Sequence, residues 1–219
     1  MNKTYSISEL TPYINWLYFY HAWGLSGKPR EDKEKMKQEA LQMLASWEEK
    51  YHTHAIFRLF EVCSEGDDLI FFLSDKKLRF PMLRQQHPSA PGEPNLCLAD
   101  FIRPLSQGIR DQVGVFCTSV DGTIIDEYSH DDYLNMMAQT LSDRLAEATA
   151  EKLHEEVRRD RAYWGYAPDE NLTIEQQHRE EYQGIRPAIG YPSLPDTSAN
   201  FLIDQLIDMK QAGIRLTET

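Results

Sequence analysis

The chain has 219 residues, 41% of them hydrophobic, and carries 23 basic against 35 acidic residues, a formal net charge of −12. This length can bury one sizeable core or two small ones, and we expect a single domain over residues 1–219. The negative charge repels phosphate backbones and anionic lipids, so neither nucleic acid nor a membrane is an expected partner. The N-terminus MNKTYSISEL lacks the apolar stretch of a signal peptide and no apolar run is long enough to span a bilayer, which predicts a cytoplasmic protein.

The three cysteines, Cys63, Cys97 and Cys117, are odd in number and widely spaced. This spacing matches neither a disulfide framework nor a CxxC metal knuckle. We therefore expect reduced, mostly buried thiols.

The first part of the chain is dense in large rings and then turns polar. Residues 13–23 hold six aromatic side chains, which need a core or a pocket wall to cover them. Residues 31–50 predict a helix, because apolar side chains recur there at the spacing of a buried stripe: Met36, Ala40, Leu44 and Trp47.

A group of strands follows this helix. Residues 54–62 and 68–73 are rich in β-branched and aromatic side chains and predict a hairpin. Residues 76–83 predict a third strand that Pro81 either ends or confines to an edge. Residues 85–95 form a loop by composition, and residues 112–120 predict another buried strand, closed by a turn at Asp121-Gly122.

Helices dominate the second half. The longest is expected over residues 131–160, with Asp131 and Asp132 suited to its start and Arg158, Arg159 and Arg161 suited to its end. A shorter helix begins with a capping box at Thr173. A last helix is expected over residues 198–212, closed by Gly213, followed by the first half of a strand in IRLTET. Strands first and helices later, without a regular βαβ alternation, predict an α+β fold with a largely antiparallel sheet.

The common signatures of catalysis are missing. The sequence has no GxSxG elbow and no phosphate-cradling glycine loop. Three Glu-x-x-His patterns suggest a metal site, but a di-metal site of this type needs a four-helix bundle that the strands and prolines do not build. Surface coincidence is the simpler interpretation of these pairs, Glu127/His130, Glu151/His154 and Glu175/His178.

The connection YQGIRPAIGYPSLPD, residues 182–196, is stiff and polar at once. Its prolines fix φ and remove N–H donors, while its glycines permit close approach of a ligand: Pro187, Pro192, Pro195, Gly184 and Gly190. Such a loop is either a plain spacer or a preformed binding wall that loses little entropy when a ligand docks. Arg186 suits a carboxylate, and the Tyr191 ring suits a heterocycle or a sulfonium cation. These groups together favour an amino-acid-bearing nucleoside as the ligand.

Five segments resemble one family, the activation domain of cobalamin-dependent methionine synthase. They are RPAIGYPSLPD from Arg186, YWGYAPDENL from Tyr163, DRLAEATAEKLHE from Asp143, CLADFI from Cys97 and ELTPYINW from Glu9. The resemblance implies a bent antiparallel β-sheet with flanking helices. It also implies binding of S-adenosylmethionine and a role in reductive remethylation of cob(II)alamin. The cobalamin would be held by a partner module, and a flavodoxin-type protein would donate the electron.

The resemblance also implies roles for single residues. Arg186 would bind the methionine carboxylate, and Ala188 and Gly190 would offer backbone contacts. Tyr191 belongs to the same motif. Glu147, on the long helix, matches an acidic position that faces the ligand amine.

Two departures from the family pattern affect the expected site. Asn15 stands where the family typically has an aspartate, and the chain ends before a sheet segment that supplies a tyrosine. The leading hypothesis is an activation domain that works in trans or as a fragment of 5-methyltetrahydrofolate-homocysteine methyltransferase, rather than as an independent enzyme. The alternative is a non-catalytic module that docks on a corrinoid protein with a degenerate ligand groove. An unrelated α+β enzyme would need a catalytic constellation that the sequence lacks.

Overall fold

The computed structural model describes residues 1–88 and 90–218. Ser89, in the predicted loop, and Thr219, at the end of the predicted last strand, lie outside the described residues. Contacts within the chain divide it into two compact units. Unit 1 comprises Met1–Ile56, Cys117–Gln183 and Gln211–Ile214, and unit 2 comprises Phe57–Phe116, Gly184–Lys210 and Arg215–Thr219.

The strands of unit 1 include one that the sequence did not indicate. β1 (Asn2–Tyr5) pairs antiparallel with the start of β2 (Thr53–Glu65), with Asn2 opposite Ile56 and Tyr5 opposite Thr53. β1 is short and mostly polar, so it lacks the alternation that predicts a strand. β5 (Asp111–Val120) also pairs with β2, and its residues from Cys117 onward belong to unit 1.

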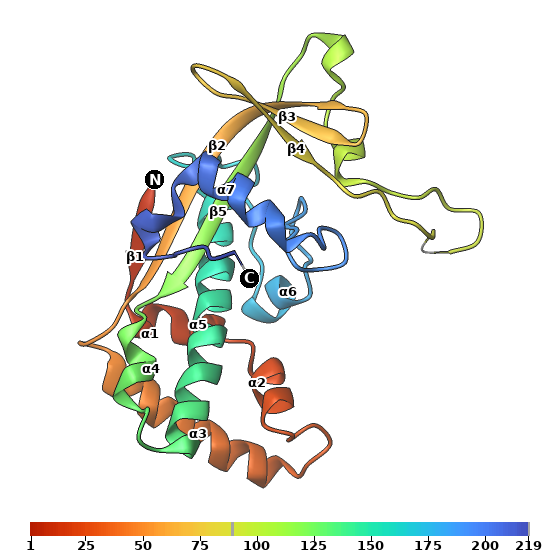
Figure 1. Cartoon of the computed structure of the whole chain (residues 1–219). Coiled ribbons are helices and arrows are strands. Elements are labelled where there is room, and N and C mark those ends of the chain that lie inside the picture. The colour runs from red at the N-terminus through yellow and green to blue at the C-terminus, as the bar shows by residue number, and fades with distance from the viewer. Residues whose placement is uncertain (89, 219) are drawn as a thin grey trace. The chain divides into compact units, whose positions relative to one another are not determined.

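The helices of unit 1 gather around α5 (Asp132–Arg159), which confirms the predicted long helix. The carboxylate of Asp131 caps it by accepting a hydrogen bond from the Leu134 N–H at 3.0 Å. Its buried face contacts each of the first four helices, and Figure 1 shows α3 lying across its N-terminal end. These helices are α1 (Ile7–Leu10), α2 (Trp16–Ala22), α3 (Arg30–Trp47) and α4 (Thr123–Glu127).

Threonine hydroxyls link α5 to the strands of unit 1. The hydroxyls of Thr149 and of Thr53 in β2 are hydrogen-bonded at 2.9 Å, and both side chains are fully buried. Thr118 Oγ1 of β5 donates to the carbonyl of Ala146 at 3.1 Å. Buried polar groups need such partners, so these bonds fix the position of α5 against the strands.

Unit 2 is built on a three-stranded antiparallel meander. The end of β2 pairs with β3 (Asp68–Phe72), which pairs with β4 (Lys77–Pro81), confirming the predicted hairpin and third strand. β4 is an outer strand and ends at Pro81, as the missing N–H of proline requires. Gly66 makes the first turn with φ +62°, a conformation that favours glycine. Two short 3-10 helices follow in the connection to β5, Leu98–Phe101 and Leu105–Gln107.

The C-terminal prediction is partly wrong. The expected helix over residues 198–212 is instead a 3-10 turn (Thr197–Ala199), α7 (Asn200–Ile207) and a second 3-10 turn (Met209–Ala212). Asp208 breaks the helix in the left-handed region at φ 49°, and the Asp204 carboxylate holds this break by accepting from the Met209 N–H at 2.8 Å. The strand expected from residue 214 does not form within the described residues up to 218.

All three cysteines are buried and none forms a disulfide with another described residue, as expected for reduced thiols. Within the part of the chain that the structure describes, no helix has both the length and the apolar character needed to cross a bilayer.

A tight turn after α5 depends on one glycine. Gly165 has φ +61°, and a Cβ placed on it would lie 2.6 Å from the Arg161 Cα. We expect Gly165→Ala to lower the free energy of unfolding by about 1–3 kcal/mol, because the added Cβ clashes with the backbone and the residue keeps an unfavourable conformation. Gly122→Ala is the matched control, because Gly122 has φ −68° and open space where a Cβ would project. Urea denaturation should show equal or slightly raised stability for the control, and a Gly165→Ala protein as stable as the wild type would contradict this account.

Candidate functional site

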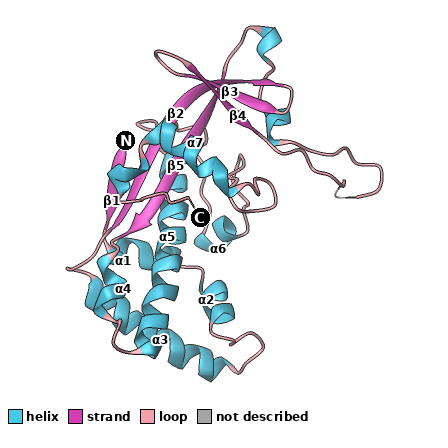
Figure 2. Cartoon of the chain, in the orientation of Figure 1, coloured by secondary structure: helices cyan, strands magenta, loops and turns pink. Residues whose placement is uncertain are grey.

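The loop of residues 184–196 carries the main group of predicted binding residues in unit 2. Figure 2 shows it as a connection without helix or strand, as predicted. Gly190 N donates to the Leu194 carbonyl and Leu194 N donates to the Tyr191 carbonyl, both at 2.9 Å. Gly184 and Gly190 take φ values of +96° and +91°, which side-chain-bearing residues rarely adopt. The loop is therefore held in one shape by its own hydrogen bonds and by its fixed dihedrals.

The predicted ligand groups of this loop differ in exposure. Arg186 is half-buried and its Nη1 atom is fully buried, so part of the guanidinium lies in an environment where a charged hydrogen bond is strong. Tyr191 is 56% exposed, which leaves its ring face open to a flat or cationic group. Ala188 is exposed, although its carbonyl accepts from the Tyr191 N–H at 3.4 Å, and the Gly190 N–H is used within the turn.

The other two predicted residues lie on neighbouring helices of unit 1. Asn15 is half-buried and caps α2, because its Oδ1 accepts from the Leu17 N–H at 3.2 Å. Glu147 is exposed on α5, and α2 contacts α5. The structure thus gathers four predicted residues in one loop of unit 2 and places Asn15 and Glu147 on two contacting helices of unit 1.

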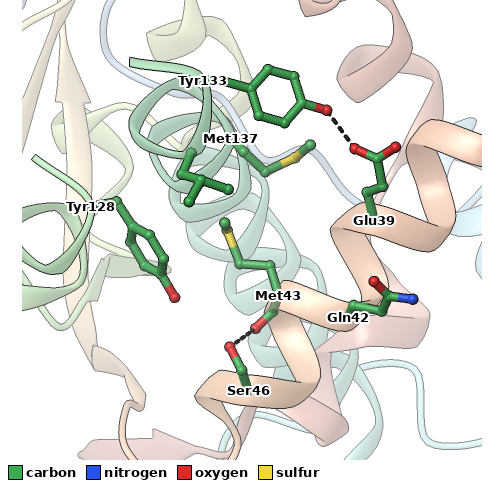
Figure 3. A pocket seen from close by; sticks show the side chains of 8 residues that line it. Glu39, Gln42, Met43, Ser46, Tyr128, Tyr133 and Met137 are labelled. Carbon is green, nitrogen blue, oxygen red and sulfur yellow. Dashed lines mark hydrogen bonds between the residues drawn. The ribbon is translucent and has the colours of Figure 1, made fainter. Parts of the chain in front are cut away.

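An open pocket of about 340 Å³ lies elsewhere in unit 1, between α3 and the first turns of α5. Figure 3 shows its lining of methionine and tyrosine side chains, with the Tyr133 hydroxyl directed at the Glu39 carboxylate. The lining residues are Glu39, Gln42, Met43, Ser46, Tyr128, Tyr133, Leu134 and Met137. They include none of the predicted binding residues.

Both tyrosine hydroxyls of this pocket already have hydrogen-bond partners. Tyr133 donates to Glu39 at 2.5 Å, and this hydrogen bond together with burial raises the pKa of Tyr133 to about 12. The Tyr128 hydroxyl accepts from the Trp47 indole at 2.9 Å. The pocket lining contains no lysine or arginine, so it offers no cation for the carboxylate of an amino-acid ligand.

No metal centre is evident in the described residues. Within residues 1–88 and 90–218, no three His, Cys, Asp or Glu side chains gather closely enough to hold an ion. Of the Glu-x-x-His pairs, Glu127 accepts hydrogen bonds from Tyr51 and Lys50. His178 lies 3.0 Å from the Tyr13 carbonyl, a hydrogen-bonding contact to backbone.

Comparisons of sequence and of structure with known proteins point to one family. A family model described as "Vitamin B12 dependent methionine synthase, activation domain" matches residues 6–219. A solved structure described as "Crystal Structure of the MetH Reactivation Domain bound to AdoHcy" is similar with a TM-score of 0.89 and 35% sequence identity. The match covers 100% of this chain and 73% of that chain.

The capping role of Asn15 can be tested separately from any ligand. Asn15→Ala removes the acceptor for the first turn of α2 and should lower the free energy of unfolding by about 0.5–2 kcal/mol. Asn15→Asp keeps the acceptor and adds a charge that the helix N-terminus favours, so its stability should be equal or higher. Urea unfolding of both variants decides this. Equal stability of Asn15→Ala and the wild type would show that the cap contributes nothing.

Proposed function

Because the chain belongs to the family of vitamin B12-dependent methionine synthase activation domains, we propose that it binds S-adenosylmethionine through the loop of residues 184–196. The observation that carries this proposal is the preformed loop with a partly buried arginine, Arg186. The similar solved structure is described as bound to AdoHcy. AdoHcy and S-adenosylmethionine share the carboxylate, the amine and the adenosine and differ by the methyl group and the positive charge on sulfur, so the contacts to the shared groups serve both.

Each site residue has a proposed role in binding. The Arg186 guanidinium binds the ligand carboxylate, and the backbone groups of Ala188 and Gly190 orient the rest of the ligand. The exposed ring of Tyr191 packs against the adenine or the sulfonium. Glu147 is a carboxylate suited to the ligand amine. The family pattern has an aspartate at the position of Asn15, and the neutral amide of Asn15 offers a cationic ligand no negative charge.

The bound ligand is proposed to serve repair of methionine synthase. A partner module of the enzyme would hold the cobalamin, which would supply the acceptor for the methyl group, and a flavodoxin-type protein would supply the electron. This chain's part is to present the methyl group of S-adenosylmethionine in a fixed orientation, which lowers the entropic cost of the transfer. We propose that residues 1–219 act as one domain in this role, either in trans or as part of a larger enzyme. β2 and β5 each contribute residues to both compact units, which supports this.

Ligand binding is the direct test. Isothermal titration with S-adenosylmethionine, and separately with AdoHcy, should give saturable heats with one site per chain. A folded protein that shows no heat at millimolar ligand would contradict the proposal.

The role of Arg186 has its own prediction. Arg186→Ala should lower the affinity about 10- to 100-fold, because the carboxylate loses a charge-assisted hydrogen bond. Arg30→Ala is the matched control, since the Arg30 side chain is 90% exposed on α3 and should leave affinity unchanged. Equal affinities of Arg186→Ala and the control, measured by the same titration, would remove Arg186 from the site.

The second candidate is a docking module for a corrinoid protein without a working ligand site. The observation that favours it is Asn15, whose side chain serves as a helix cap and carries no charge. Under this alternative the chain captures a cobalamin-binding module, while calorimetric titrations with S-adenosylmethionine and AdoHcy show no heat of binding. If Asn15→Asp instead raises the affinity for S-adenosylmethionine about two- to fivefold, as an added charge partner should, the ligand-binding function is favoured.

A further inference from the structure

A buried arginine near the end of α5 has no role in the site described so far. Arg158 lies in the last turn of α5, where the sequence pattern expected it, and its side chain is fully buried. Its Nε donates to Glu170 Oε2 at 2.7 Å, and its Cζ lies 4.6 Å from the centroid of the Tyr182 ring. Burial of a charge is costly unless it is paired. Here Glu170 pairs with Nε and the Tyr182 ring lies near Cζ, while Nη1 and Nη2 are buried without a hydrogen bond to a described residue. The pair therefore holds Glu170 and Tyr182 in place.

Both backbone groups of the next residue, Gln183, are bound within the same unit. Its N–H donates to the second oxygen of Glu170 at 3.4 Å, and its carbonyl accepts from the Tyr166 hydroxyl at 3.1 Å. His154 Nε2 lies 3.3 Å from that hydroxyl. A phenol has one hydrogen, which goes to Gln183, so His154 Nε2 is the donor in this contact. The result is a directed chain of hydrogen bonds from α5 to the backbone of Gln183.

The ring of Tyr182 is fixed as well. It is 8% exposed and lies between Arg158 and His154, whose ring meets it edge-on at 4.6 Å between centroids. Burial raises the pKa of Tyr166, although the charge of Arg158 opposes this, so the Tyr166 hydroxyl keeps its hydrogen at neutral pH. Two consecutive residues, 182 and 183, are thus anchored by side chains from α5 and from the turn that follows it.

The anchored residues directly precede the proposed ligand loop. Gly184 follows Gln183 and turns the chain with φ +96°, and only Ile185 then separates it from Arg186. Each residue spans about 3.8 Å, so a displacement of Gln183 has little chain in which to relax before it reaches the guanidinium. A loop whose starting point is fixed also loses less freedom when a ligand docks.

We propose that Tyr166, Glu170, Arg158 and His154 form a loop anchor that positions the root of the 184–196 loop for ligand binding. These are positioning residues, because they bind Tyr182 and Gln183 and not the ligand. The inference rests on the proposed function for its consequence in affinity. Its structural part, an ordered loop root, concerns the ligand-free protein alone.

Tyr166→Phe is the smallest change that tests the anchor. It removes the hydroxyl bound to Gln183 and keeps the ring, which packs edge-on against Trp164 at 4.9 Å. Loss of one hydrogen bond should speed amide exchange of residues 184–186 and 188–191 about two- to tenfold in the ligand-free protein, and should weaken AdoHcy binding by a similar factor. Tyr163→Phe is the matched control, because it also removes a tyrosine hydroxyl from this turn, from a ring that lies 5.1 Å from Lys3 Nζ. It should change neither the amide exchange of the loop nor the affinity for AdoHcy.

The outcomes separate the anchor from a general effect on stability. Faster exchange confined to the loop, with an unchanged urea midpoint, is the expected result. Exchange at the wild-type rate in Tyr166→Phe overturns the anchor, and so does faster exchange that extends evenly along α5, which would mean a merely structural role. If the wild type binds AdoHcy, an equal affinity of Tyr166→Phe for AdoHcy overturns the anchor too. If the wild type binds no AdoHcy, the proposed function fails, and the exchange rates alone decide whether the anchor exists.

Discussion

The continuous buried face of α5 is the constraint on which unit 1 depends. A helix of 28 residues with apolar side chains along one side, among them Leu141, Leu145 and Ala148, gives the shorter helices a common surface to pack against. α1, α2 and α4 are too short to be stable alone in water, so their stability comes from this packing. The threonine bonds from Thr149 and Thr118 then tie the same helix to the strands.

The end of α5 carries a different kind of interaction from its middle. Around its centre the helix buries apolar area, whereas its last turns bury a charge, a histidine and the backbone contacts of the following turn. Polar networks of this kind add less to stability than apolar packing of the same volume, but they select one geometry. The two parts of α5 therefore have different roles. Its centre stabilises the fold, and its end orients the chain that leads into the proposed ligand loop.

Local sequence signals predicted most of the elements, and tertiary contacts explain the exceptions. The hairpin around Gly66, the strand ending at Pro81 and the capping box at Thr173 each depend on a few neighbouring residues, and all three form. β1 was missed because it is short and mostly polar, and it forms only through its pairing with the distant β2. The break at Asp208 was missed because a non-glycine residue in the left-handed region has no reliable sequence signal. For the candidate site, loop composition indicated Arg186 and Tyr191, whereas Glu147 and Asn15 came only from the family resemblance.

The buried cysteines give each compact unit an internal reporter. Cys63 and Cys97 lie in unit 2 and Cys117 lies in unit 1, and their exposed fractions are 1%, 2% and 8%. A thiol sheltered to this degree reacts with an alkylating reagent only after the surrounding structure opens. Differences in labelling among the three positions would therefore rank the local opening of the two units without any introduced probe.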